Sequence, residues 1–176
     1  MTKDCHEGGG REIRRVPGYL AIIAGKDEYL VDQDGRACYD KARKAAGPDA
    51  EAEIISAQIL RVDDARVLEL QFAESVKTLS MFGGKRVIWL RNLNLVADTV
   101  QAKSEEVKKN LANILEVATS ADPSVSIIIS ATPYDGRRKD LSSLKSAAQD
   151  FILHASPSKS PFDKGDAQAD NQVALV

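Results

Sequence analysis

The stretch Tyr19-Leu20-Ala21-Ile22-Ile23-Ala24 is continuously apolar and lies between Pro17-Gly18 and Gly25. A short apolar run bounded by turn residues is typical of a β-strand that is buried on both faces. Strands of this kind belong to parallel sheets, because the crossover connections place helices over both faces. The stretch therefore predicts a buried strand of an α/β domain.

Further apolar runs follow at regular intervals and predict four more strands. They lie at residues 87–90, 125–129 and 151–153, with a weaker run at 53–55. Between the runs, apolar residues recur at helical spacing on three faces. These faces carry Val31, Cys38, Ala42 and Ala45; then Leu68, Phe72, Val76 and Leu79; then Val107, Leu111, Ile114, Leu115 and Ala118.

The helix boundaries follow from capping and breaking residues. Gly47-Pro48 should end the first helix, and Asp63 or Asp64 is a plausible N-cap of the second. A shorter fourth helix is expected near residues 141–148. Strict alternation of five strands and four helices predicts a three-layer α/β domain with a mainly parallel sheet and right-handed crossovers.

Composition narrows the class of protein. The chain has 176 residues, 43% hydrophobic and 28% charged, as in an ordinary soluble domain. Its net charge of -2 offers no overall attraction to nucleic acid, so any DNA contact would be local. Two cysteines and two histidines suit neither a disulfide framework nor a zinc site, and we expect a protein of the reducing cytoplasm.

The chain divides into three parts. Residues 1–17 are charged and glycine-rich, which predicts a flexible segment rather than a signal peptide. Residues 18–154 form the predicted domain. The composition of residues 155–176 predicts a polar linker and the start of a missing second domain, so the chain is expected to be a piece of a longer protein. No apolar run is long enough to span a bilayer, and no membrane contact is expected.

The loops after the strands lack the residues for nucleotide chemistry. A phosphate loop would need a glycine five residues before Gly25 and a serine or threonine after Lys26, but Leu20 and Asp27 stand there. Asp27-Glu28 would instead favour the start of a helix. Ser130-Ala131-Thr132 follows the fourth strand where a hydrolase would place acidic residues.

Other enzyme classes also lack a key group. A phosphoacceptor receiver domain needs an aspartate at the end of its third strand, where Arg91-Asn92 stands. No serine has the glycine pattern of a nucleophile elbow, and His6 and His154 lie near the ends of the domain. No catalytic residue, metal site or cofactor is therefore predicted.

Two kinds of surface group remain as candidate contacts. Arg137, Arg138 and Lys139 could meet phosphate or an acidic partner, or could form a solvated loop. Met81 and Phe82 stand at a helix-to-strand corner before Gly83-Gly84, which breaks the helix. Both side chains could pack into the core or face water as a docking site.

Three segments together resemble one known family. They are Gly25-Lys26-Asp27-Glu28-Tyr29-Leu30 after the first strand; Thr78-Leu79-Ser80-Met81-Phe82 with Gly83-Gly84-Lys85-Arg86; and the strand from Ile127 that leads to Asp135, Arg137-Arg138 and Leu144-Lys145. Their order and spacing resemble the N-terminal domain of the delta subunit of bacterial DNA polymerase III, the clamp-opening subunit of the clamp loader. The likeness spans residues 18–154.

The resemblance implies an AAA+ module without a working P-loop and without activity of its own, within the DNA polymerase III holoenzyme, a nucleotidyltransferase complex that acts in DNA replication. It implies clamp binding through Met81 and Phe82, positioned by Leu79 and Ser80, with Thr78 at the start of the element. Met81 stands where the family usually has leucine, a change that conserves volume.

The same resemblance implies a set of partners. They are the beta sliding clamp, the tau/gamma and delta prime subunits in the full-length protein, and DNA through the assembled loader. Two rival hypotheses stay open on the residues alone. One is a divergent P-loop-like hydrolase or kinase that uses Lys26, and the other is a nucleic-acid-binding module that uses Arg137, Arg138 and Lys139.

Overall fold

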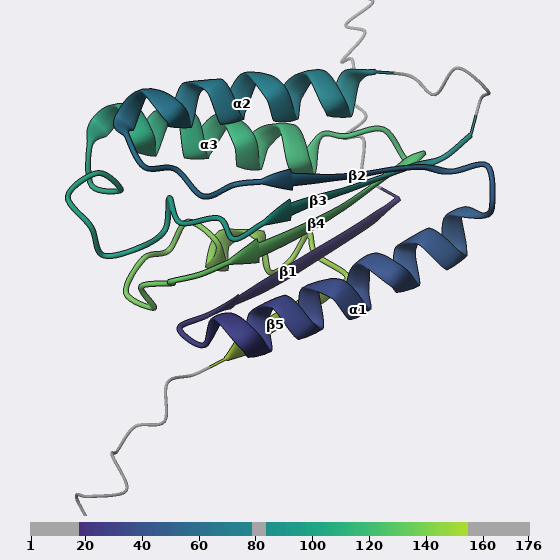
Figure 1. The fold of residues 1–176 in the computed structure, drawn as a ribbon, viewed down its shortest axis with the longest axis horizontal. Helices are drawn as coiled ribbons and strands as arrows, with labels where there is room; N and C mark the ends of the chain where they lie inside the picture. The colour runs from purple at the N-terminus through teal and green to yellow at the C-terminus, as the bar shows by residue number, and fades with distance from the viewer. Residues whose placement is uncertain (1–17, 79–83, 155–176) are drawn as a thin grey trace, which may run out of the picture.

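The structure is a computed structural model, and it describes residues 18–78 and 84–154. Five strands form a single sheet in the order β2-β3-β4-β1-β5 (Figure 1). The strands are β1 (Tyr19–Gly25), β2 (Glu51–Ser56), β3 (Arg86–Arg91), β4 (Val125–Ala131) and β5 (Asp150–His154). Every registered pair is parallel. The predicted strands are confirmed, and the sheet of the described residues is parallel throughout.

Helices cover the sheet on both faces, which confirms the predicted three layers. Figure 1 shows α1 (Glu28–Ala46) on one side and both α2 (Val62–Lys77) and α3 (Glu105–Thr119) on the other. Successive residues of β1 face opposite sides, so Leu20 and Ile22 join the core under α2 and α3, whereas Ala21 joins the core under α1. The sheet therefore separates two apolar cores.

The fourth predicted helix is wrong as an α-helix. Residues 141–148 contain only a short 3₁₀ helix, Ser142–Leu144. The hydroxyl of Ser142 donates to the carbonyl of Lys139, and the hydroxyl of Ser143 donates to that of Asp140. Such local side-chain bonds compete with the α-helical ladder, while buried Leu141 and Leu144 still pack on the core.

The predicted N-cap of α2 is also wrong. Arg61 takes the N-cap position, and Asp64 lies three residues later. The carboxylate of Asp64 accepts the backbone N–H groups of Leu60 and Arg61, at 3.1 and 2.8 Å. These bonds satisfy donors at the helix start and hold the pKa of Asp64 below its ordinary value. Asp64 therefore stabilises the start of α2 from inside the first turn.

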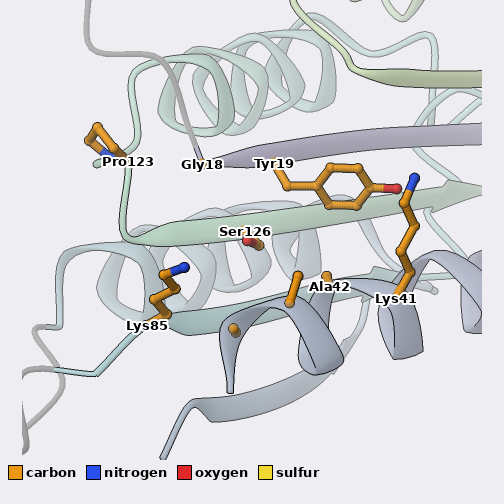
Figure 2. A pocket seen from close by; sticks show the side chains of 9 residues that line it. Gly18, Tyr19, Lys41, Ala42, Lys85, Pro123 and Ser126 are labelled. Carbon is orange, nitrogen blue, oxygen red and sulfur yellow. The ribbon is translucent and has the colours of Figure 1, made fainter.

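Ala45 does not lie on the buried face of α1, contrary to the prediction. It is exposed, and it lines a hollow of about 240 Å³ between the last turns of α1 and the sheet (Figure 2). The core-facing residues of α1 are Val31, Gly35, Cys38, Tyr39 and Ala42. In the last turn of α1, Ala46 rather than Ala45 packs against this core. Leu79, predicted on the second helical face, lies outside the described residues, as do segments 1–17 and 155–176.

A polar contact joins β5, β1 and α1. The hydroxyl of Tyr19 donates to Asp150 Oδ2 at 2.5 Å, and Lys41 Nζ donates to the same oxygen at 2.8 Å. Lys41, followed by Tyr19, holds the pKa of Asp150 below its ordinary value. Burial, followed by the bond to Asp150, raises the pKa of the Tyr19 hydroxyl. The edge strand β5 is thus tied to the helix as well as to its neighbouring strand.

We expect Asp150→Asn to remove an acid-sensitive part of the stability. Because the folded state lowers the pKa of Asp150, its contribution is present above the unfolded-state pKa of about 3.9 and is lost as pH falls through the folded-state value. Urea unfolding from pH 7 to pH 3 should show a difference between the two proteins that shrinks toward acid. Asp49→Asn, at an exposed carboxylate, is the control. A difference that stays constant over this range would contradict the assignment.

Candidate functional site

The C-terminus of α2 leads to the candidate docking segment. Thr78 caps the helix, and both its backbone N–H and its hydroxyl donate to the carbonyl of Glu74, at 2.9 and 2.8 Å. Its backbone is extended, so the chain leaves the helical path at this residue. Leu79, Ser80, Met81 and Phe82 lie outside the described residues. Thr78 is therefore the one predicted clamp-binding residue whose position the structure describes.

Arg86 fixes the other end of this segment. Its guanidinium donates to the carboxylates of Glu51 at 3.1 Å and Glu53 at 3.0 Å, both on the neighbouring strand β2. A longer contact of 3.5 Å reaches the carbonyl of Thr78. The Arg86 side chain is only 14% exposed, so these ion pairs are partly shielded from water. The guanidinium links the end of α2, the start of β3 and the start of β2.

The end of α2 and the start of β3 lie at the amino edge of the sheet, where the parallel strands begin (Figure 1). The backbone N–H of Glu51 donates to the carbonyl of Lys85, so the residue after Gly84 is also held by β2. Lys85 and Gly18 line the hollow at this edge (Figure 2). Thr78 and Lys85, which lie on either side of segment 79–83 in the sequence, are thus each bonded to a residue of the sheet.

The opposite, carboxyl edge is where ligands usually bind to an α/β sheet. The β1–α1 connection consists of only Lys26 and Asp27. The carboxylate of Asp27 accepts the N–H of Leu30 at 3.1 Å, which confirms Asp27 as a helix-start residue. A connection of two residues, with a carboxylate on the helix N-terminus, leaves no backbone cradle for phosphate.

The end of β3 carries polar residues that face the start of α1. Arg91 Nε donates to Asp32 at 2.5 Å, and the Asn92 amide donates to Glu28 at 3.2 Å. Asn92 has φ 60, a left-handed conformation that asparagine tolerates better than most residues. These residues bind the carboxylates of α1, and they occupy the position where a receiver domain would place its phosphoacceptor aspartate.

The loop after β4 contains the predicted basic cluster, whose members differ in their surroundings. Arg137 is exposed and forms ion pairs with Asp135 and Asp98, beside a hollow of about 500 Å³. This contact holds the pKa of Asp135 below its ordinary value. Lys139 is exposed. The three residues therefore do not form one continuous cationic surface.

Arg138 is the best-anchored member of the cluster. Its side chain is 14% exposed, and its Nη1 donates to the carbonyls of Leu95 and Ala102 at 2.8 and 3.1 Å. Its Nε donates to Asp140 at 2.7 Å. These bonds connect the loop after β4 to the loop before α3. Sequence reasoning did not anticipate this structural role.

Arg86 was also missed, although the sequence held a signal. Glu51 and Glu53 alternate along β2, so both carboxylates face the same side of the sheet as Arg86 at the start of β3.

His154 contacts Asp34 at 2.9 Å, and no group of potential metal ligands occurs among residues 18–78 and 84–154. No helix in these ranges is long and apolar enough to cross a membrane.

A sequence model of the DNA polymerase III delta subunit matches residues 22–155, which include the α2–β3 connection and nearly the whole sheet. The chain belongs to the DNA polymerase III delta subunit family. The resemblance of the three sequence segments is thereby confirmed, and family membership supports a role in the clamp loader of DNA polymerase III. No curated protein matches the chain significantly.

We expect Arg86→Met to destabilise the domain by about 2 kcal/mol, because it removes hydrogen bonds to two partly shielded carboxylates and leaves their charges close together. Lys85→Met is the matched control, because Lys85 is the exposed neighbour. Urea unfolding of both variants measures the difference. Equal stability of the two variants would contradict the role of Arg86 at the α2–β3 connection.

Proposed function

We propose that this domain binds the beta sliding clamp through Met81 and Phe82 and, within the complete clamp loader, helps to hold one interface of the ring open. Family membership is the observation that carries the proposal. The attachment of Thr78 and Arg86 to the sheet supports it, because a segment with fixed ends loses less conformational freedom when it binds.

The energetic requirement for this role is modest. Burying a Met or Phe side chain contributes roughly 1.5–3 kcal/mol, so two such side chains provide an effective anchor. Ring opening needs no covalent step by this domain. A difference in affinity between the closed and open clamp is sufficient to change their populations.

We further propose an AAA+-like module that has lost nucleotide binding. The sheet order, with β1 between β4 and β5, and the two-residue β1–α1 connection both support this interpretation. ATP would then act on neighbouring subunits of the tau/gamma type, with delta prime completing the loader. Exposed Arg137 and Lys139 are candidates for contacts with DNA in that assembly, whereas Arg138 would position their loop. A cytoplasmic location would accompany this role.

The double variant Met81→Ala/Phe82→Ala should bind the clamp at least about a hundredfold more weakly, because roughly 3 kcal/mol of apolar burial is lost. Titration of the clamp by calorimetry measures the affinity. The matched control is Leu60→Ala/Val100→Ala, which removes two side chains that are 80% and 86% exposed at the carboxyl edge. If both double variants bind the clamp as the parent does, Met81 and Phe82 are not the anchor.

ATP with Mg²⁺ should leave the melting temperature of the domain unchanged. A ligand present at a hundred times its Kd would stabilise the native state by about 2.7 kcal/mol, which a thermal scan detects easily. AMP with Mg²⁺ controls for nonspecific ionic effects. A rise in melting temperature with ATP that disappears in Lys26→Ala would support the rival P-loop-like enzyme. It would reject an AAA+-like module that has lost nucleotide binding.

A further inference from the structure

Within residues 18–78 and 84–154, one side of the backbone of the outer strand β2 pairs with no other strand. Strand β2 is the last strand in the sheet order and pairs with β3. The N–H groups of Glu51 and Ala57 donate toward β3, to Lys85 and Arg91. Because alternate residues of a strand direct their N–H and C=O groups to the same side, those of Ala52, Ile54 and Ser56 point away from β3. Such an edge can accept a further strand.

The described part of the chain also leaves the face of β2 on the side of α1 exposed. Helix α1 packs against β1, β3 and β4. The β2 side chains on this face are Ala52, Ile54 and Ser56, and all three are exposed. Ile54 is 47% exposed, although its register partner Trp89 is completely buried. The sheet therefore extends one strand beyond its helical cover.

Two arginines of α1 border this uncovered face. The Arg36 guanidinium lies 5.7 Å from the Trp89 ring centroid, and that of Arg43 lies 5.8 Å from the Tyr39 ring centroid. Stacking on an aromatic ring fixes a guanidinium without neutralising its charge. Neither arginine forms a salt bridge with any residue in the described ranges. By contrast, Arg91 on the same face is paired with Asp32.

A hollow of about 380 Å³ lies where α1 ends and β2 begins. Arg43 and Lys44 line it together with Asp40, Gly47, Pro48 and Ala50, the residue before β2. We call the surface formed by Ala52, Ile54, Ser56, Arg36 and Arg43 the β2 shelf. At the start of β2, this shelf continues into the hollow, so the strand edge lies beside a recess lined by two cationic side chains and one carboxylate.

We propose that the β2 shelf binds an extended, acidic peptide segment of a partner protein, which adds to β2 as a further strand. The open backbone groups supply the hydrogen bonds of strand addition. Acidic side chains that project toward α1 would meet Arg36 and Arg43, which form no salt bridge with the described residues. The shelf is defined without Met81 and Phe82, and we assign it a second interaction.

The shelf suits a peptide better than a nucleic acid or a second copy of this chain. Single-stranded nucleic acid needs exposed aromatic faces for base stacking, but Trp89 and Tyr39 are buried. A second copy could offer its own β2, yet Glu51 and Glu53 of that strand are already bound by Arg86 and lie on the opposite face from Ala52 and Ile54. An acidic peptide from a partner protein needs no exposed aromatic ring, and its carboxylates can lie on the same face as Arg36 and Arg43.

The test uses the full 176-residue chain and a fluorescein-labelled, acetylated and amidated hexapeptide that alternates glutamate with valine. Fluorescence anisotropy measures binding, and hydrogen exchange follows the amide of Ile54. We expect saturable binding and slower exchange at Ile54. The Arg36→Gln/Arg43→Gln variant should bind about tenfold more weakly, because two partly exposed ion pairs are lost. Lys77→Gln/Lys109→Gln makes the same charge change on α2 and α3 and should bind normally.

Strand addition has its own controls. Ile54→Pro removes an outward N–H without removing a bond to β3, and it should abolish binding. A peptide that is N-methylated at alternate residues should also fail to bind, and this result does not depend on the stability of a variant. An alternating lysine and valine peptide should bind at least tenfold more weakly than the acidic peptide.

Several results would overturn the proposal. They are the absence of saturable binding by the acidic peptide, equal binding of the N-methylated or lysine peptide, and unchanged binding by Arg36→Gln/Arg43→Gln. Competition by a thymidine oligonucleotide that itself protects Ile54 would assign the shelf to nucleic acid. A dimer in sedimentation that Ile54→Pro dissociates would assign it to a second copy. The Met81→Ala/Phe82→Ala variant should bind the peptide normally, so this test is independent of clamp binding.

Discussion

The parallel pairing of β1 with β4 on one side and β5 on the other is the constraint on which the rest of the domain depends. Leu20 through Ala24 are completely buried, so their backbone groups must find partners within the sheet. Both neighbouring strands provide those partners, and both faces supply apolar contacts. Once β1 is fixed between two strands, the helices can pack only on the two faces of the sheet. The connecting loops then lie either at the amino edge, where the strands begin, or at the carboxyl edge, where they end.

The sheet therefore has two separate edges, the carboxyl edge and the amino edge, and each can carry a binding site. The carboxyl edge, where related folds bind ligands, is occupied by contacts such as Asp27 with Leu30 and Arg91 with Asp32. At the amino edge, Arg86 links the end of α2 to the starts of β2 and β3. Polar side chains thus tie the start of α1 to β3 at one edge, and the end of α2 to β2 and β3 at the other.

Sequence patterns predicted the strands well because burial on both faces leaves a continuous apolar signal that local context does not alter. They failed where polar side chains decided the outcome. The serine hydroxyls at residues 142 and 143 bind nearby carbonyls and limit the last helix, and Asp64 binds backbone N–H groups from the third helical position. Arg86 meets Glu51 and Glu53 across 35 and 33 residues, a pairing that depends on strand register. The predicted anchors Met81 and Phe82 remain a prediction.

Gly18 approaches the α3–β4 turn so closely that a Cβ atom added to it would lie 2.2 Å from the carbonyl oxygen of Pro123. Its N–H also donates to the carbonyl of Val125 at 3.0 Å, which fixes where the chain enters the sheet. That entry point lines the same hollow as Lys85 (Figure 2), whereas β5 ends at His154 on the opposite edge. A surface linkage at Gly18 would therefore crowd the amino edge, whereas a linkage at His154 would leave this edge accessible.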